Sequence, residues 1–305
     1  MKLAAIDIGT HSVLLVIIEK KSDGTLQVLE DHATLTRIGE GMGSHQVFLA
    51  GGMERTLTLL KRYKNTCDQH QVEKMIAVGT AAFRKAQNAK QFVADVKKEC
   101  GIAIDIIPGE REAELTWKAA STDFGEEIAV LDIGGGSTEV IAQKENGNLF
   151  CTSMPIGSVY LTEKFVHSDP ISEEEYKKIC NVIDEHLNSL NIDTKAHRHI
   201  DTFVATAGTA TTLAAIKAKM KIYHHHEVHG STLSLDEVTQ VIKELKSKTI
   251  AERKKISGLE PGRADVILAG ATLMQKVAQH FGIQTITVSD RGVRWGLIYE
   301  ALSQI

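Results

Sequence analysis

The sequence contains no apolar run long enough to cross a membrane, which takes roughly 18 consecutive apolar residues. The N-terminal stretch MKLAAIDIGTHSVLLVIIEKK comes nearest, but Asp7 interrupts its apolar part. The same aspartate breaks the continuous apolar segment that a secretory signal peptide requires. We therefore expect no membrane partner and no targeting segment.

Cysteine and net charge are also scarce. The four cysteines, Cys67, Cys100, Cys151 and Cys180, lie far apart without CxxC spacing. This pattern fits reduced thiols in a cytoplasmic protein better than a disulfide framework or a zinc site. The net charge is only −4, so the chain has no general attraction to nucleic acid or to an acidic membrane surface. An anionic ligand must then be held by local groups.

No low-complexity linker or basic tail divides the chain. Its 305 residues, 43% of them hydrophobic, are enough to bury a large core. The length is nearer to two domains than to one. The sequence therefore predicts a globular protein, and a domain boundary must be found from its motifs.

The most informative stretch is IAVLDIGGGSTE, residues 128–139. Its opening apolar run predicts a buried strand, and the three glycines after it, 134–136, favour a turn that suits only glycine. The backbone N–H groups of such a turn can surround phosphoryl oxygens, and Asp132 at the strand end suits a hydrated Mg²⁺. The stretch thus predicts a site where an anion and a metal ion meet.

A second copy of this pattern lies near the N-terminus, in LAAIDIGTHS. Asp7 there corresponds to Asp132, an offset of 132 − 7 = 125 residues. A repeat of this size is a domain rather than a solenoid unit, so we expect two similar α/β domains whose glycine turns face a cleft. The expected boundaries are 1–125 for the first domain, with a terminal helix at about 290–305 packing back on it, and 126–289 for the second.

Other expected strands end at small or charged residues. The segment GTAAFRK, at the end of the strand expected at 74–79, brings Arg84 to a strand end, where ligands of open α/β sheets bind. The glycine-spaced loop TRIGEGMG carries Arg37, and a third small-residue turn, AGTAT, follows the strand expected at 202–206. A lone surface arginine is more often a solvated charge, so position alone does not assign a role to it.

Two patterns allow an ordinary structural interpretation. The acidic residues of PGEREAE enter a helix, where they favour the helix dipole. Four histidines, His224, His225, His226 and His229, invite a metal site. Neighbouring histidines in a polar connector cannot all face one ion, however, so we expect a solvated loop there.

The whole chain resembles the exopolyphosphatase and guanosine pentaphosphate phosphohydrolase family, within the actin, hexokinase and Hsp70 superfamily. The matching segments, in order, are DIGTHSVLL, TRIGEGMG, GTAAFRKAQN, IIPGEREAEL, DIGGGSTEV, ATAGT, GLEPGRADVI and SDRGVRWGLIYE. The resemblance implies an α/β fold of two duplicated actin-like, ribonuclease H-like domains flanking a cleft. It also implies an exopolyphosphatase-type hydrolase of phosphoanhydride bonds with Mg²⁺ as its cofactor.

The resemblance further implies a role for each matching residue. Glu112 would be the catalytic base, in preference to a role in helix capping. Mg²⁺ would be held by three carboxylates, those of Asp132, Glu139 and Asp7. Phosphate would be bound by Gly9, Thr10, His11, Ser12, Arg37, Arg84, Gly134, Gly135, Gly136, Ser137, Gly208 and Thr209.

The chain departs from the family pattern at three positions. His11 stands where asparagine is frequent, Arg111 stands where a second acid usually precedes Glu112, and Glu114 replaces a frequent arginine. We also expect a short form without the C-terminal helical domain that lengthens the polyphosphate channel of longer relatives and helps them to dimerise.

Three functions remain open at this stage. The first is release of terminal orthophosphate from inorganic polyphosphate by a water molecule that Glu112 activates. The second is hydrolysis of guanosine pentaphosphate, and the third is a non-catalytic sensor of polyphosphate or an alarmone. A sugar or acetate kinase is disfavoured because nothing identifies a pocket for a phosphate acceptor. A homodimer and a monomer both remain open.

Overall fold

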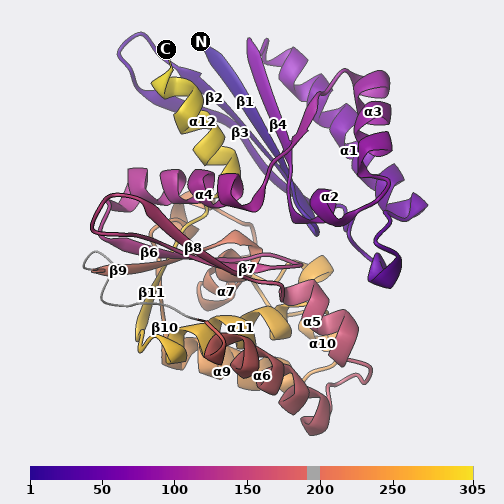
Figure 1. Ribbon diagram of the computed structural model, residues 1–305, viewed down its shortest axis with the longest axis vertical. Helices are drawn as coiled ribbons and strands as arrows, with labels where there is room; N and C mark the ends of the chain where they lie inside the picture. Colours follow the sequence, from indigo (N-terminus) through magenta and orange to yellow (C-terminus); the bar gives the residue numbers. More distant parts are fainter. Residues whose placement is uncertain (191–199, 305) are drawn as a thin grey trace. The chain divides into compact units, whose positions relative to one another are not determined.

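The computed structural model describes residues 1–190 and 200–304, in which the chain forms two compact units (Figure 1). Unit 1 comprises Met1–Ala119 and Val293–Ile305, and unit 2 comprises Ala120–Gly292. Each unit contains one mixed sheet, which confirms the predicted α/β fold class. That the units are separate domains with the predicted boundaries stays a prediction.

Unit 1 is built on a sheet with the strand order β3-β2-β1-β4-β5. Its strands are β1 (Lys2–Ile8), β2 (Ser12–Lys20), β3 (Leu26–Leu35), β4 (Lys74–Gly79) and β5 (Ile104–Ile106). Its helices are η1 (Gly43–His45), α1 (Ala50–Gln69), α2 (Ala81–Lys85), α3 (Ala89–Cys100), most of α4 (Gly109–Phe124) and α12 (Val293–Ser303).

Strand β1 is buried on both faces, which explains its nearly continuous apolar sequence. Because side chains alternate along a strand, Ala4, Ile6 and Ile8 join the core packed with α1 and α3, whereas Leu3 and Ala5 join the core packed with α12. Figure 1 shows these helices on opposite faces of the sheet. The centre of the sheet is thereby fixed by hydrophobic contacts from both sides.

Unit 2 is built on a sheet with the strand order β10-β11-β9-β6-β7-β8. Its strands are β6 (Ile128–Ile133), β7 (Thr138–Gln143), β8 (Leu149–Met154), β9 (Thr202–Thr206), β10 (Thr232–Ser234) and β11 (Thr285–Val288). Its helices are α5 (Ser158–Phe165), α6 (Glu173–Asn188), α7 (Ala207–Lys217), α8 (His225–Val228), α9 (Leu235–Lys246), α10 (Ile250–Arg253), η3 (Pro261–Arg263) and α11 (Ile267–His280).

The two sheets share one topology. The order β3-β2-β1-β4-β5 of unit 1 recurs as β8-β7-β6-β9-β11 in unit 2, where β10 is an additional edge strand. In both sheets the first three strands, β1-β2-β3 and β6-β7-β8, form an antiparallel meander. The two strands on the other side of the first strand, β4-β5 and β9-β11, run parallel to it. The sequence repeat around Asp7 and Asp132 therefore corresponds to a repeat in structure.

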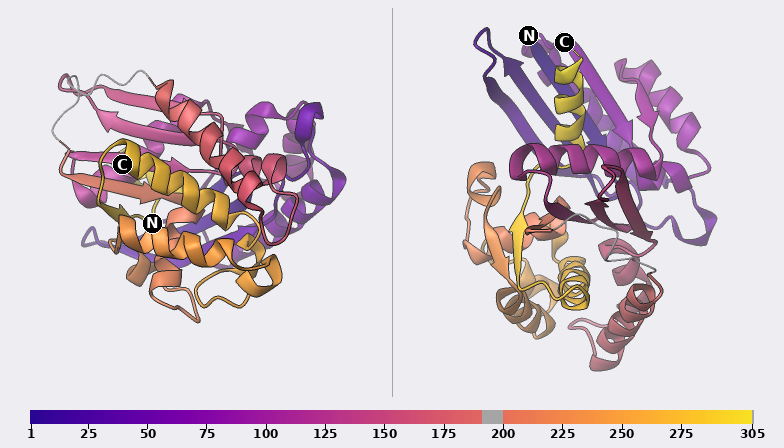
Figure 2. Two further views of the ribbon diagram at one scale, coloured as in Figure 1. Left: turned by 90° about the horizontal axis from the view of Figure 1, so that it is seen from below. Right: turned by 60° about the vertical axis from the view of Figure 1, so that its left-hand side comes forward.

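Helices α6, α9 and α11 cover one face of the sheet of unit 2 (Figures 1 and 2). Helices α6 and α9 begin at two capping boxes, Ser172 with Glu175 and Ser234 with Glu237. In each, the serine side chain accepts from the third backbone N–H of the helix and the glutamate accepts from the serine N–H, so two of the unsatisfied donors of the helix end are paired. Among the described residues, none of the helices is long and apolar enough to cross a membrane.

Two predicted elements differ from the structure. A local reading of the sequence ends the strand that starts at Leu26 at Glu30, but β3 runs on to Leu35, because its pairing with β2 continues to that residue. The small-residue segment 207–211 is not a turn but the beginning of α7, after a single residue, Ala207, with φ of +66°. In both places pairing or packing outweighs the local sequence preference.

Candidate active site

The parallel strands of unit 1 bring three predicted site segments to one edge of its sheet. Ile8 of β1 lies opposite Gly79 of β4, and Gly79 lies opposite Ile106 of β5. The three segments that follow these strands therefore leave the sheet together, as expected for a ligand site of an α/β sheet. They carry the first glycine turn, Arg84 and Glu112.

The first glycine turn is closed by its own backbone. The Gly9 N–H donates to the Ser12 carbonyl oxygen over 2.9 Å. From the loop that carries Arg37, the Gly39 N–H donates to the Thr10 carbonyl oxygen, also over 2.9 Å. A Cβ atom at position 39 would lie 2.4 Å from Thr10 Cγ2 and 3.2 Å from the Thr10 carbonyl oxygen, so glycine permits this close approach without displacing Thr10.

The loop around Arg37 is attached to the same turn by two more backbone hydrogen bonds. The N–H groups of Thr36 and Arg37 both donate to the carbonyl oxygen of His11, over 3.1 and 2.9 Å. His11, one of the departures from the family pattern, is itself buried. The structure thus brings Arg37 next to the predicted phosphate-binding turn.

Glu112 lies in the first turn of α4 and pairs with Arg84. Arg84 Nη1 donates to Glu112 Oε2 over 2.6 Å and to the carbonyl oxygen of Ile107 over 3.1 Å. Burial raises the pKa of the Glu112 carboxyl, and the charge and hydrogen bond of Arg84 partly oppose that rise. Glu112 is therefore a largely buried carboxylate held by one cation.

The two other departures near Glu112 compensate each other. Arg111 Nη1 donates to Glu114 Oε2 over 3.1 Å, and Arg111 Nη2 contacts Glu300 of α12. The unusual arginine is thus neutralised by acidic partners on its own helix and on α12. In the described part of the chain, the one hydrogen bond found for the Glu112 carboxylate comes from Arg84 and not from either departure.

Asp7 stands at the end of β1 with one carboxylate oxygen in the interior. Its Oδ1 atom is buried without a hydrogen-bond partner among the described residues. Burial and, next, the charge of Glu112 raise the pKa of Asp7 to about 7, against an opposing effect of Arg294. A buried oxygen that lacks a proton donor suits a hard cation, because carboxylate oxygens are the ligands that Mg²⁺ prefers.

The second glycine turn repeats the first in unit 2. The Gly134 N–H donates to the Ser137 carbonyl oxygen over 3.0 Å, as Gly9 does to Ser12. The Gly134 carbonyl accepts from the Ser158 N–H, and the Gly135 carbonyl accepts from two further N–H groups of α5, at 159 and 160. The start of α5 therefore fixes this turn.

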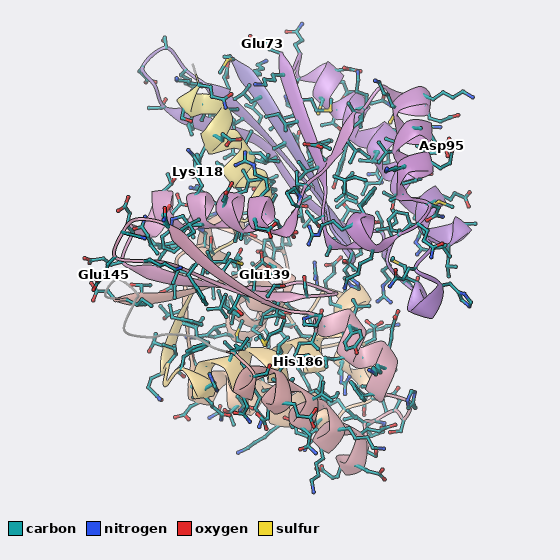
Figure 3. All side chains as sticks on the ribbon, viewed as in Figure 1. Glu73, Asp95, Lys118, Glu139, Glu145 and His186 are labelled. Atoms are coloured by element: carbon teal, nitrogen blue, oxygen red, sulfur yellow. The ribbon has the colours of Figure 1, made fainter. Side chains whose placement is uncertain are left out.

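Asp132 and Glu139 form a cross-strand pair. They lie directly opposite each other on β6 and β7, and Figure 3 labels Glu139 on the sheet. Ser153 of β8 donates its hydroxyl to Glu139 Oε1 over 2.9 Å. Two carboxylates in this position repel each other, and a divalent cation would offset that repulsion.

Gly208 and Thr209 lie in the first turn of α7. A Cβ at position 208 would lie 2.1 Å from Nη1 of Arg263, a residue in the segment GLEPGRADVI whose role the sequence alone does not indicate. Because β9 runs parallel to β6, with Thr206 opposite Asp132, this turn leaves the same sheet edge as the second glycine turn. The structure thus groups it with the other phosphate-binding candidates of unit 2.

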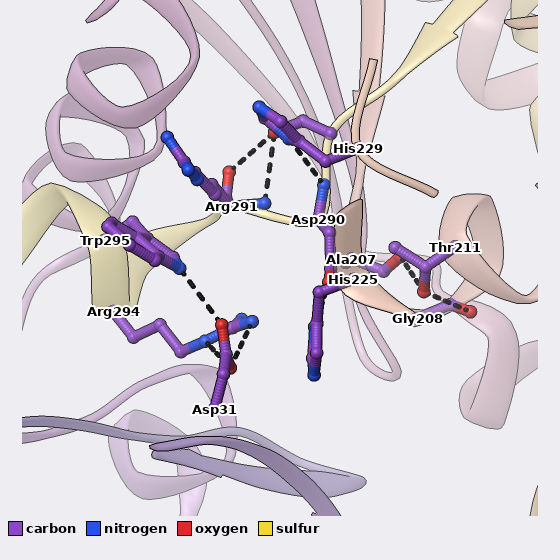
Figure 4. Close-up of polar contacts among 11 residues, drawn as sticks. Asp31, Ala207, Gly208, Thr211, His225, His229, Asp290, Arg291, Arg294 and Trp295 are labelled. Atoms are coloured by element: carbon purple, nitrogen blue, oxygen red, sulfur yellow. Dashed lines mark hydrogen bonds and ion pairs between the residues drawn. The ribbon is translucent and has the colours of Figure 1, made fainter. Parts of the chain in front are cut away.

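The histidine segment is not simply a solvated loop. Part of it forms α8, and two of its histidines contact carboxylates that are distant in sequence (Figure 4). His225 Nδ1 contacts Asp290 Oδ2, and His229 Nε2 lies 3.5 Å from Asp123 Oδ2. No group of three or more His, Cys, Asp or Glu side chains that could hold a metal ion occurs within 1–190 and 200–304.

Unit 1 contains a buried ion pair that no sequence motif indicates. Arg294 at the start of α12 donates through Nε and Nη2 to Asp31 Oδ1, over 3.1 and 2.9 Å (Figure 4). Trp295 Nε1 donates to the other oxygen over 3.4 Å. Asp31 lies in β3 and its partner is 263 residues away, so no local pattern connects the two.

Comparison with known proteins relates the chain to one family. The family model for Ppx/GppA phosphatases matches residues 16–305. Exopolyphosphatase 2 of Mycobacterium tuberculosis strain H37Rv is 31% identical over 311 residues, which cover 97% of each chain. A crystal structure of an Aquifex aeolicus member of the Ppx/GppA family has a TM-score of 0.81 and 34% identity, and the match covers 100% of this chain and 98% of that one.

A further relative is a longer protein. The bifunctional 3-dehydroquinate synthase/phosphatase of Fusobacterium nucleatum is 32% identical over 313 residues. The match covers 98% of this chain but 46% of that protein. The chain thus spans about half the length of this relative.

Proposed function

We propose, because the chain belongs to the Ppx/GppA phosphatase family, that it releases terminal orthophosphate from inorganic polyphosphate. The match of residues 16–305 to the family model confirms the predicted family and the predicted class of enzyme, a hydrolase. The substrate, the metal ion and the roles of single residues are our proposals.

The observation that carries this proposal is the position of Glu112 beside Arg84 (2.6 Å) at the carboxyl edge of the sheet of unit 1. Hydrolysis of a phosphoanhydride needs a group that orients the attacking water and accepts its proton. A carboxylate whose pKa is raised by burial is a stronger base than one in water. Arg84 keeps that carboxylate ionised and supplies a positive partner for phosphoryl oxygens.

Phosphate binding is proposed for both glycine turns. In unit 1, backbone amides of residues 9–12 would donate to phosphoryl oxygens, with Arg37 and Arg84 as charge partners. In unit 2 the same role falls to residues 134–137, and Gly208 and Thr209 would add a contact at the start of α7. The shared hydrogen bond of the two turns, from Gly9 to Ser12 and from Gly134 to Ser137, supports equivalent roles.

The carboxylates fit Mg²⁺ by their chemistry. Asp7 offers a buried oxygen without a partner among the described residues, and Asp132 and Glu139 offer two acids opposite each other on neighbouring strands. We propose Asp7 in unit 1 and, separately, Asp132 and Glu139 in unit 2 as ligands of Mg²⁺. When bound, Mg²⁺ would neutralise charge on the phosphoryl oxygens during the transfer.

The proposed reaction requires Glu112 to carry one proton from the attacking water molecule to solvent. Glu112 accepts a proton from water as the water oxygen bonds to the terminal phosphorus. The bond between that phosphorus and the bridging oxygen breaks, which leaves orthophosphate and a chain shortened by one phosphate. Glu112 then returns its proton to solvent.

Phosphate release from defined-length polyphosphate and from guanosine pentaphosphate, measured side by side with Mg²⁺, tests this proposal. Faster release from polyphosphate is the expected result. Faster release from guanosine pentaphosphate would make the nucleotide the substrate. Binding of either compound without any phosphate release would contradict the proposed hydrolase activity and favour a non-catalytic sensor of polyphosphate or an alarmone.

A further inference from the structure

Arg55 of α1 reaches into the loop that carries Arg37. Its Nε donates to the carbonyl oxygen of Thr36 over 2.8 Å, and its Nη2 lies 3.4 Å from the carbonyl oxygen of Arg37. The same Nη2 donates to Glu40 Oε2 over 3.0 Å. One guanidinium group therefore holds three oxygen atoms from a segment of five residues, 36–40.

These contacts converge on Arg37 from two directions. Arg55 fixes the carbonyl of Arg37 directly, and it also holds Glu40, whose Oε1 lies 3.5 Å from Arg37 Nη1. Glu40 thus stands between the two arginines, with one carboxylate oxygen toward each. The backbone and the side chain of Arg37 are both tied to Arg55.

The backbone of Arg37 needs such support. Its φ is +51°, in the left-handed region, which is unfavourable for a residue with a Cβ. A strained conformation persists only where the surroundings over-determine it. Here the N–H of Arg37 is held by His11 and its carbonyl by Arg55.

The same loop is attached to the first glycine turn. Three of its N–H groups, those of residues 36, 37 and 39, donate to carbonyls of His11 and Thr10 within that turn. On its other side the loop packs against α1, where a Cβ on Gly52 would lie 3.2 Å from Cα of Ile38. Helix α1, the Arg37 loop and the glycine turn are therefore in direct contact, one after the other.

We propose that Arg55 is a positioning residue, which holds the Arg37 guanidinium at the phosphate-binding turn through the Arg37 carbonyl and through Glu40. The inference rests on the proposed function in one respect, that Arg37 binds a phosphate of the substrate. Arg55 does not touch substrate in this account. Its planar fork is required because a lysine ammonium, a compact charge, cannot span two carbonyls and a carboxylate in one geometry.

A binding experiment with a matched control tests this role. The Kd of inorganic tripolyphosphate is measured by calorimetry for the parent and for Arg55→Gln, Arg55→Lys, Glu40→Gln and Arg62→Gln. Arg62→Gln removes the same charge from the exposed side of the same helix. We expect Arg55→Gln and Arg55→Lys to weaken binding about tenfold, Glu40→Gln to weaken it about threefold, and Arg62→Gln to change it less than twofold. Full binding by Arg55→Lys would mean that only charge matters and would overturn the proposal.

A double-mutant cycle separates positioning from a general loss of structure. If Arg55 acts through Arg37, then Arg55→Gln should weaken tripolyphosphate binding less than twofold when Arg37→Gln is already present. If the double variant instead shows the product of the two single fold-changes in Kd, the proposal is overturned. In turnover of polyphosphate, Arg55→Gln should raise KM about tenfold with a much smaller change in kcat. A parent that binds tripolyphosphate but releases no phosphate would contradict the proposed hydrolysis, and the binding cycle would still decide the role of Arg55.

Discussion

Two opposing effects set the ionisation of Glu112. Burial raises the pKa of its carboxyl, and the charge and hydrogen bond of Arg84 lower it. The side chains remain partly accessible, at 18% for Glu112 and 28% for Arg84, as a base that must meet water requires. Arg84 therefore has two roles in our account, because it also binds phosphoryl oxygens.

Replacement of Arg84 should change the pH profile as well as the rate. In Arg84→Gln the pKa of Glu112 should rise, because burial remains while the opposing charge is lost. The acid limb of kcat/KM should then move to higher pH, and kcat/KM at neutral pH should fall about 100-fold. The measurement is phosphate release between pH 5 and pH 9. Lys85→Gln, a substitution of the neighbouring charge on α2, serves as the control. If the acid limb of Arg84→Gln stayed at the pH of the parent, the proposed pairing of Arg84 with Glu112 would be wrong.

Asp7 should make the metal-free protein less stable as pH rises. Its pKa is raised from 3.8 to about 7 in the folded state, so between these values the folded protein binds a proton that the unfolded chain has released. This contribution to stability is complete below pH 3.8 and is lost as pH rises through about 7. In a buffer that contains a metal chelator, Asp7→Asn should abolish this loss of stability with rising pH.

Urea unfolding at pH 5 and pH 8 measures this effect. At pH 8 Asp7→Asn should exceed the parent in free energy of unfolding by on the order of 1 to 3 kcal/mol, and Asp105→Asn, at an exposed position of β5, should not. An Asp7→Asn protein with the same pH dependence as the parent would contradict the assigned cause.

At the level of secondary structure, several elements could be predicted because their signals are local. The strands at 74–79 and 202–206 match the predicted bounds. The extension of β3 past Glu30 could not be predicted, because it depends on pairing with β2 and places a charged residue, Asp31, in a buried ion pair.

The second glycine turn depends on a distant glycine that the motif does not include. A Cβ at Gly157 would lie 2.5 Å from the carbonyl carbon of Gly135 and 2.6 Å from the carbonyl oxygen of Gly134. Gly157→Ala must therefore displace the turn. We expect a loss of about 1 to 3 kcal/mol in stability and a fall in kcat/KM of at least about tenfold.

Thermal unfolding and phosphate release measure the two effects. Gly292→Ala is the control, since its Cβ would meet its nearest neighbour, Thr206 Oγ1, at an ordinary 3.5 Å. If Gly157→Ala kept the activity and stability of the parent, the account of how this turn is held would be wrong.

For the whole molecule, the two units have separate hydrophobic cores. Ile17 belongs to a core of unit 1 and Ile183 to the core of unit 2, and both are fully buried. If each unit is a domain, calorimetry should resolve two unfolding transitions. Ile17→Ala and Ile183→Ala should each cost about 2 to 5 kcal/mol of stability. Ile17→Ala should lower the midpoint temperature of one transition, and Ile183→Ala that of the other. A single transition that both substitutions lower equally would show one cooperative unit.

The motifs predicted the residues that stand at strand ends but not the residues that support them. Glycine turns, Arg84 and Glu112 are found from sequence because strand, turn and functional residue are adjacent in the chain. Arg55 and Arg294 are not, because Arg55 acts on carbonyls up to 19 residues away and Arg294 on a carboxylate 263 residues away. Such contacts appear only when the chain is folded.

The central claim is that Glu112 is the base that activates water. Its most direct test is phosphate release from polyphosphate with Mg²⁺ in a single turnover, for the parent, Glu112→Gln and Glu110→Gln. Glu110 lies on the same helical turn and is exposed, so it controls for the loss of one acidic charge. We expect Glu112→Gln to bind tripolyphosphate but to release phosphate at least about 100-fold more slowly, and Glu110→Gln to match the parent. Release by Glu112→Gln at the rate of the parent would contradict the account.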